Sequence, residues 1–170
     1  MKMDQLDAME RDSFVSAVGW VFEHSPWVAE RVWPKRPFGT AAALHQAMVE
    51  AVACAAPEEQ IALIRAHPDL GARVRMSGAS SGEQKGAGLD RLTPEQFQRL
   101  LRLNSAYREK FGFPFIFAVR HSGIETILEA LQSRLASEPA AERGAALAQI
   151  YRIAQFRLED LIDAPVHERQ

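Results

Sequence analysis

The sequence predicts a compact all-α protein, a single-domain bundle of about eight to nine helices spanning residues 1–170. A chain of 170 residues, 47% of them hydrophobic, is long enough to bury one sizeable core. Apolar residues recur at helical spacing through most of the chain, and capping residues stand at several expected helix starts. One short stretch, residues 113–119, is strand-like and has no second strand with which to form a sheet.

In the N-terminal part, one helical face is predicted from four apolar residues, namely Phe14, Val18, Val21 and Phe22. Ser25 and Pro26 are the expected cap and first-turn proline of a short helix that runs through Val32. A connector follows over residues 33–39, and Thr40 is the expected cap of an alanine-rich helix.

The other predicted helices span residues 58–66, 94–110, 124–135 and 141–162. Thr93 and Pro94 form a well-defined helix start, with Gln96 at the capping-box position. Pro68 disfavours the helical conformation for the residue before it. The helix over residues 58–66 should therefore end at His67, with the imidazole at the helix mouth and outside the core.

Composition excludes several classes of function. A net charge of −2 provides no general attraction to nucleic acid, and the apolar stretches are too short to span a bilayer. The single Cys54 excludes an internal disulfide or a multi-cysteine metal site, and it suits a reducing compartment. The histidines are scattered and no His-Glu-x-x-His motif is present, so no metal site is expected. The N-terminus has no apolar signal core, and we expect a cytoplasmic protein.

Two segments have the character of a binding site. His67 is a titratable group directly before Pro68, although a lone histidine in such a position is more often a capping or loop residue. The run over residues 113–119 lacks a sheet, yet its backbone N–H and C=O groups need partners. A ligand rich in amide and imide groups is one candidate. We also expect at least one of the phenylalanines of this run to be ordinary core.

The stretch from Met76 to Leu89 is rich in glycine and serine, a composition that usually indicates a surface loop. Ser80 and Ser81 could nevertheless cap a turn of helix that contains Glu83. Free N–H groups at a helix start can bind a polar ligand. The glycines match neither a phosphate-binding loop nor a dinucleotide fingerprint.

Three motifs in order resemble one family. They are His67-Pro68-Asp69-Leu70-Gly71, then Ser-x-x-Glu-Gln-x-x-Ala-Gly-Leu beginning at Ser80, then Leu103-Asn104-x-x-Tyr107-x-x-Lys110-Phe111-Gly112-Phe113-Pro114-Phe115. The chain resembles the 2-oxo-4-hydroxy-4-carboxy-5-ureidoimidazoline (OHCU) decarboxylases of urate degradation. The resemblance extends from Ser25 to Arg157, and the stretch between His67 and Glu83 looks shorter than in some relatives.

The resemblance implies an all-helical homodimer that needs no cofactor and converts this small-molecule substrate to (S)-allantoin. It implies that His67 donates a proton, and that Glu83 and Arg157 are functional residues. The implied substrate contacts are Pro68, Ser80, Ser81, Gly82, Glu83, Gln84, Phe115, Ile116, Phe117, Ala118 and Val119. Arg157 could instead have a purely structural role. It would then form an ion pair with a carboxylate, or extend into solvent from its apolar helix stripe.

A second function class stays open from sequence alone. An all-α chain of this size could be a binding or adaptor module that holds ureido compounds or a protein partner without turnover. The joint presence of His67, Glu83 and Arg157 favours the enzyme. A dimer would also explain apolar residues that look exposed, namely Trp27, Val28, Trp33 and Phe38.

Overall fold

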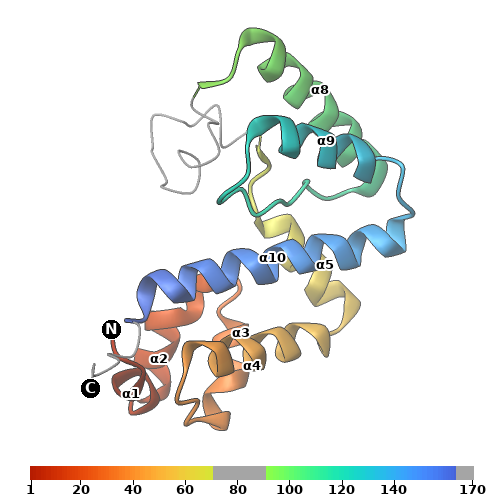
Figure 1. Cartoon of the computed structure of the whole chain (residues 1–170). Coiled ribbons are helices and arrows are strands. Elements are labelled where there is room, and N and C mark those ends of the chain that lie inside the picture. Colours follow the sequence, from red (N-terminus) through yellow and green to blue (C-terminus); the bar gives the residue numbers. More distant parts are fainter. Residues whose placement is uncertain (71–90, 164–170) are drawn as a thin grey trace. The chain divides into compact units, whose positions relative to one another are not determined.

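The computed structural model describes residues 1–70 and 91–163, and these residues form eight α-helices and two short 3₁₀ helices (Figure 1). No β-strand occurs in these two ranges, so the all-α prediction is confirmed. The chain divides into two compact units. The first contains residues 1–66 and 151–170, and the second contains residues 67–150. The prediction that residues 1–170 form one domain stays a prediction.

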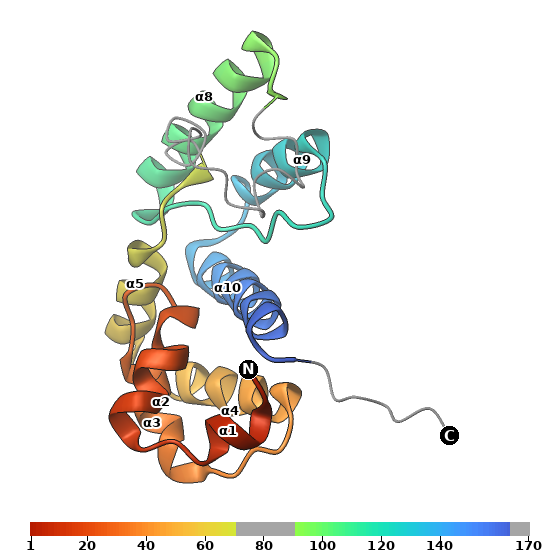
Figure 2. The ribbon, with the colours of Figure 1, turned by 90° about the vertical axis from the view of Figure 1, so that its left-hand side faces the viewer.

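The first unit is built from short helices. They are α1 (Met3–Asp7), α2 (Arg11–Val18), η1 (Gly19–Val21), α3 (Trp27–Val32), η2 (Trp33–Lys35), α4 (Ala41–Ala53) and α5 (Pro57–Ala66). The C-terminal part of α10 (Pro139–Leu161) also belongs to this unit. The N-terminus lies beside the end of α10 (Figure 2), where the Met1 ammonium contacts the Asp163 carboxylate at 3.0 Å. No described helix is long and apolar enough to span a membrane.

The second unit consists of α8 (Pro94–Phe111), α9 (Ile124–Arg134) and the first part of α10. Helices α8 and α9 lie side by side in Figures 1 and 2. Each buries an apolar stripe, and the fully buried members of these stripes include Leu100, Tyr107, Ile127, Leu128 and Leu131. The run between α8 and α9 belongs to no helix and no strand, as expected for an extended segment without a sheet.

Capping chemistry explains the helix starts that were predicted well. The Thr40 hydroxyl accepts from the Ala43 N–H at 3.1 Å. At α8, the Thr93 hydroxyl accepts from the Gln96 N–H at 3.2 Å, and Gln96 Oε1 accepts from the Thr93 N–H at 3.0 Å. This reciprocal pair is the predicted capping box.

Two predictions for the N-terminal part are wrong. Ser25 does not cap α3, because Pro26 takes the N-cap position and no side chain caps this helix; the Ser25 hydroxyl donates to the Glu23 carbonyl at 2.8 Å. The helix that carries Phe14 ends at Val18, and a 3₁₀ turn follows it. Phe14, Val18, Val21 and Phe22 are all buried nonetheless.

The apolar surface expected around Trp27, Val28, Trp33 and Phe38 is not exposed. Val28 is buried, and the other three side chains are partly covered by their own chain. The Arg31 guanidinium lies 4.3 Å from the Trp27 ring centroid. The Arg36 guanidinium lies 4.2 Å from the Trp33 ring centroid. Among the described residues, Trp20 is the exposed large apolar side chain.

The capping box provides a test of α8. Thr93→Ala removes the hydroxyl acceptor from the first turn and should lower the free energy of unfolding by about 1 kcal/mol. Thr93→Ser keeps the acceptor and should cost less. Urea unfolding followed by circular dichroism measures both variants, and equal stability of the two would contradict the assigned cap.

Candidate active site

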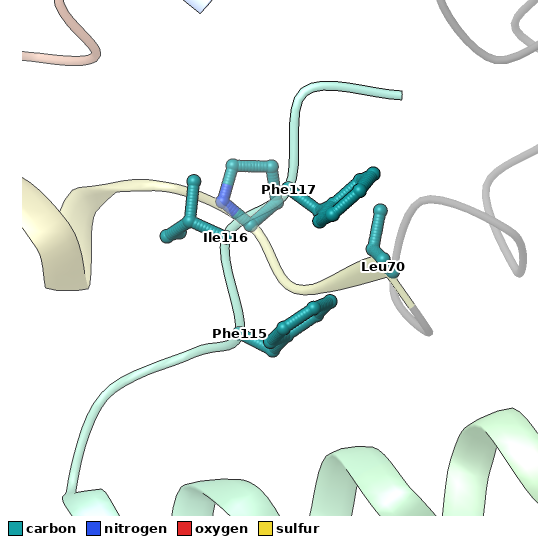
Figure 3. A pocket seen from close by; sticks show the side chains of 5 residues that line it. Leu70, Phe115, Ile116 and Phe117 are labelled. Atoms are coloured by element: carbon teal, nitrogen blue, oxygen red, sulfur yellow. The ribbon is translucent and has the colours of Figure 1, made fainter. Parts of the chain in front are cut away.

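A small hollow in the second unit brings two of the sequence motifs together (Figure 3). Its lining residues are Pro68, Leu70, Phe115, Ile116 and Phe117. The first two follow His67 directly, and the other three belong to the run after α8. The motif that contains the histidine and the strand-like motif therefore form the two walls of one apolar pocket.

His67 stands at the junction between α5 and this pocket. Helix α5 ends at Ala66, which confirms the predicted helix end before Pro68. The expectation that the imidazole lies outside the core is wrong, since His67 is only 2% exposed. Leu70, three residues further on, is also buried, whereas Pro68 lines the pocket and is exposed.

The side chains of the run alternate, as they do in extended backbone. Figure 3 shows the rings of Phe115 and Phe117 on the same side, with Leu70 beside them, whereas Ile116 points to the opposite side. The two rings are stacked with centroids 6.0 Å apart and an interplanar angle of 16°. Phe113 and Phe115 are buried, so the expectation that at least one phenylalanine belongs to the core is confirmed.

The backbone of this run is held by two side chains. Arg134 Nη1 donates to the Ile116 carbonyl at 2.9 Å, and Gln149 Oε1 accepts from the Ala118 N–H at 2.9 Å. In the part of the chain that the structure describes, Ala118 is the one residue of 115–119 whose N–H donates a hydrogen bond. The N–H groups of the other four residues therefore donate no hydrogen bond within the described residues.

A buried polar cluster lies behind the run. The Tyr107 hydroxyl donates to Glu142 Oε1 at 2.5 Å, and Arg134 Nε donates to the same oxygen at 2.6 Å. Tyr107 is fully buried, Glu142 is 1% exposed, and the Arg134 guanidinium lies 4.6 Å from the Phe115 ring centroid. Burial, followed by the hydrogen bond to the Glu142 carboxylate, raises the pKa of Tyr107 far above its usual value, so the phenol stays protonated.

Helix α8 contributes to the same region. It ends at Gly112, whose φ of +76° is the left-handed conformation that favours glycine, and the chain then turns into the run. Arg108 forms an ion pair with Asp69 at 3.6 Å, which connects α8 to the segment after His67. Asn104, one turn earlier, is 8% exposed, and its side-chain amide has no hydrogen-bond partner among the described residues.

Arg157 lies on α10 in the first unit. Its Nη2 donates to Glu23 Oε1 at 2.5 Å, and its Nη1 donates to the Val21 carbonyl at 3.2 Å. This is the ion pair with a carboxylate that a purely structural role of Arg157 predicts. The structure therefore shows a structural role for Arg157, and its role toward a substrate stays a prediction. The predicted residues Ser80, Ser81, Gly82, Glu83 and Gln84 lie outside the described residues.

Sequence reasoning missed the residues that support the run. No local pattern distinguishes Arg134, Glu142 and Gln149, because all three lie on regular helices. Leu70 was quoted only as part of a motif, yet it lines the pocket. Among the described residues, no group of three His, Cys, Asp or Glu side chains is placed to hold a metal ion.

Comparison with known proteins identifies the family of this chain. A family model described as OHCU decarboxylase matches residues 7–159. The chain is 44% identical to a 2-oxo-4-hydroxy-4-carboxy-5-ureidoimidazoline decarboxylase of Halalkalicoccus jeotgali, over 95% of this chain and 92% of that protein. It is 43% identical to the protein of the same name from Haloferax volcanii, over 94% of this chain and 95% of that protein.

A solved structure shares the fold. The crystal structure of (S)-allantoin synthase superposes with a TM-score of 0.81 at 32% identity, and the match covers 96% of this chain and 55% of that one. The fold and the sequence thus place the chain in a class of decarboxylases associated with urate degradation. The chain belongs to the OHCU decarboxylase family.

The buried tyrosine predicts a pH dependence of stability. Above pH about 10 the unfolded chain loses the Tyr107 proton and the folded chain keeps it. The free energy of unfolding should therefore fall with rising pH, by up to about 1.4 kcal/mol per unit for this group. Tyr107→Phe should show a shallower fall between pH 9 and 11 in urea titrations. Parallel curves for the two proteins would contradict the assignment.

Proposed function

We propose that this chain decarboxylates 2-oxo-4-hydroxy-4-carboxy-5-ureidoimidazoline to (S)-allantoin, with His67 as the proton donor and without a cofactor. The observation that carries the proposal is the pocket itself. It is lined by the residues that follow a buried histidine and by a backbone run in which, within the described residues, only the Ala118 N–H donates a hydrogen bond. Membership of the OHCU decarboxylase family supports the same reaction.

The chemistry explains why a small protein could suffice. Loss of CO2 breaks the bond between the carboxylate and C4, and the electron pair forms a C4–C5 double bond while the former C5 imine nitrogen becomes an amine. That nitrogen takes up one proton, C5 takes up another, and the C4 hydroxyl releases one to become a carbonyl. The substrate thus serves as its own electron sink, a task that other decarboxylases assign to a cofactor.

The protein's share is to orient the substrate and to protonate one face of C5. A positioned histidine suits this task, since its unperturbed pKa lies near neutral pH. The nearly parallel rings of Phe115 and Phe117, which line the pocket, suit a planar ring. Open N–H groups of residues 115–119 would bind the ring or ureido carbonyls, whereas the Ala118 N–H already has an acceptor in Gln149.

Glu83 and the residues around it complete the proposal. Glu83 would hold one imidazole tautomer or bind the substrate hydroxyl, and Ser80, Ser81, Gly82 and Gln84 would contact the substrate. Arg157 would stabilise negative charge with its planar guanidinium. Its ion pair with Glu23 means that this carboxylate would have to share the guanidinium with the substrate.

The role of His67 is tested by His67→Gln, which keeps a hydrogen-bonding side chain of similar length at this buried position. The variant should lose the stereoselective formation of allantoin, with a rate about 10²- to 10⁴-fold lower, because the general acid is gone. Time-resolved circular dichroism of the product, started with freshly generated substrate, measures both the rate and the stereoselectivity. Far-ultraviolet spectra must show an intact helical fold.

The matched control is His45→Gln in the first unit. His45 Nε2 bonds to the Tyr151 carbonyl at 2.8 Å and has no part in the proposed chemistry. This variant should keep its stereoselectivity. An unchanged rate in folded His67→Gln would remove His67 from the mechanism. A wild-type protein that binds allantoin but does not accelerate the reaction would support the binding or adaptor module instead.

We also propose the homodimer and the cytoplasmic location that the sequence suggests. The dimer is supported by the family resemblance and no longer by an exposed aromatic surface, since Trp27, Trp33 and Phe38 are partly covered. Light scattering of the active protein should give about twice the chain mass of 19.0 kDa. An active protein with the mass of one chain would contradict the dimer.

A further inference from the structure

Within the described residues, side chains hold the run after α8 along one edge. In extended backbone, the C=O of one residue and the N–H of the residue two positions on point to the same side. The Ile116 carbonyl and the Ala118 N–H therefore share one edge, where Arg134 and Gln149 bind them, each at 2.9 Å. Side chains of α9 and α10 thus take the place that a neighbouring strand would occupy in a sheet.

The arginine that holds this edge is itself fixed. Its guanidinium is bound to Glu142, which is 1% exposed and also accepts from the Tyr107 hydroxyl at 2.5 Å. The ring of Phe115, a wall of the pocket, lies 4.6 Å from the guanidinium carbon. Because a buried charge pair resists separation, Arg134 acts as a rigid support for the Ile116 carbonyl.

The same alternation of backbone groups determines which groups lie on the opposite edge of the run. It presents the N–H and C=O of Phe117 and the N–H of Val119, and neither N–H donates a hydrogen bond within the described residues. Phe117 also lines the pocket. A donor, an acceptor and a second donor in a row match a cyclic ureide, whose ring alternates carbonyl oxygens with N–H groups.

We propose that Arg134 and Gln149 are positioning residues, which fix the run so that its Phe117 and Val119 edge binds the ureide groups of the substrate in one orientation. This inference rests on the proposed function and extends it to residues that do not touch the substrate. Orientation decides which face of C5 receives the proton. Loss of either support should therefore weaken substrate binding and lower the enantiomeric purity of the product.

Gln149 offers the cleaner test because it lies outside the buried charge cluster. Gln149→Asn shortens the side chain by one methylene, so that its oxygen no longer reaches the Ala118 N–H. Gln149→Glu keeps the length and an acceptor oxygen within reach. The Asn variant should raise KM about tenfold and yield partly racemic allantoin, with kcat changed about threefold or less, because one backbone anchor is lost. The Glu variant should restore both values toward wild type.

The matched control is Gln155→Asn on the same helix. Gln155 is exposed and bonds to Glu159 at 3.0 Å, so this variant should behave as wild type. For the other anchor, Arg134→Lys keeps the charge but cannot reach both Glu142 and Ile116 with a planar fork. Arg134→Lys should therefore raise KM as Gln149→Asn does. Its control is Arg99→Lys, which affects a surface hydrogen bond to Gln132.

The wild-type protein is measured first in the same assay. If wild type converts the substrate stereoselectively and folded Gln149→Asn retains the wild-type KM and enantiomeric purity, the positioning role is wrong while the proposed function stands. If wild type produces only racemic allantoin at the spontaneous rate, the proposed function fails and this inference fails with it. Should Gln149→Asn lose its helical spectrum, the KM and product purity of Arg134→Lys decide by the same criteria.

Discussion

The structure of the candidate site depends on one buried ion pair, that of Arg134 with Glu142. A strand-like run without a sheet leaves its backbone polar groups without partners, and such groups are costly to bury. Arg134 provides a donor for the Ile116 carbonyl, and Glu142 with the Tyr107 hydroxyl keeps this donor in place. The same guanidinium packs on the Phe115 ring. The shape of the pocket wall and the direction of its N–H groups thus share one origin.

Much of the helical framework could be predicted because its signals are local. Thr40 and Thr93 cap their helices as expected, since a β-region threonine followed by helix-forming residues has little else to bind. Ser25 does not cap its helix because the N-cap position falls one residue later, at Pro26, whose side chain has no hydrogen-bonding group. The aromatic residues near Trp33 were misjudged because their cover comes from arginines and from a loop, which periodicity does not reveal.

The site was predictable in part for a similar reason. His67 before Pro68 and the strand-like run are both visible as local departures from helical pattern, and the structure brings their neighbours to one pocket. Arg134, Glu142 and Gln149 lie on regular helices and differ in no local way from surface residues. Their function arises from contacts with residues 18 and 31 positions away, namely Arg134 with Ile116 and Gln149 with Ala118. No spacing rule connects such pairs.

The proposed reaction makes this rigid support more important than a strongly perturbed catalytic group. The uncatalysed decay of the substrate also yields allantoin, as a racemate, so the distinctive product of the protein is a single enantiomer. An enantiomer is selected by geometry: the donor must face one side of C5 and the ring must not turn over. In the proposed mechanism, His67 would meet the first condition. The second requires asymmetric binding of a planar ring, which contact with the Phe115 and Phe117 rings alone would not provide, because an aromatic surface accepts either face. Hydrogen bonds from a backbone edge of fixed direction remove that ambiguity, and the anchors at Ile116 and Ala118 fix the direction.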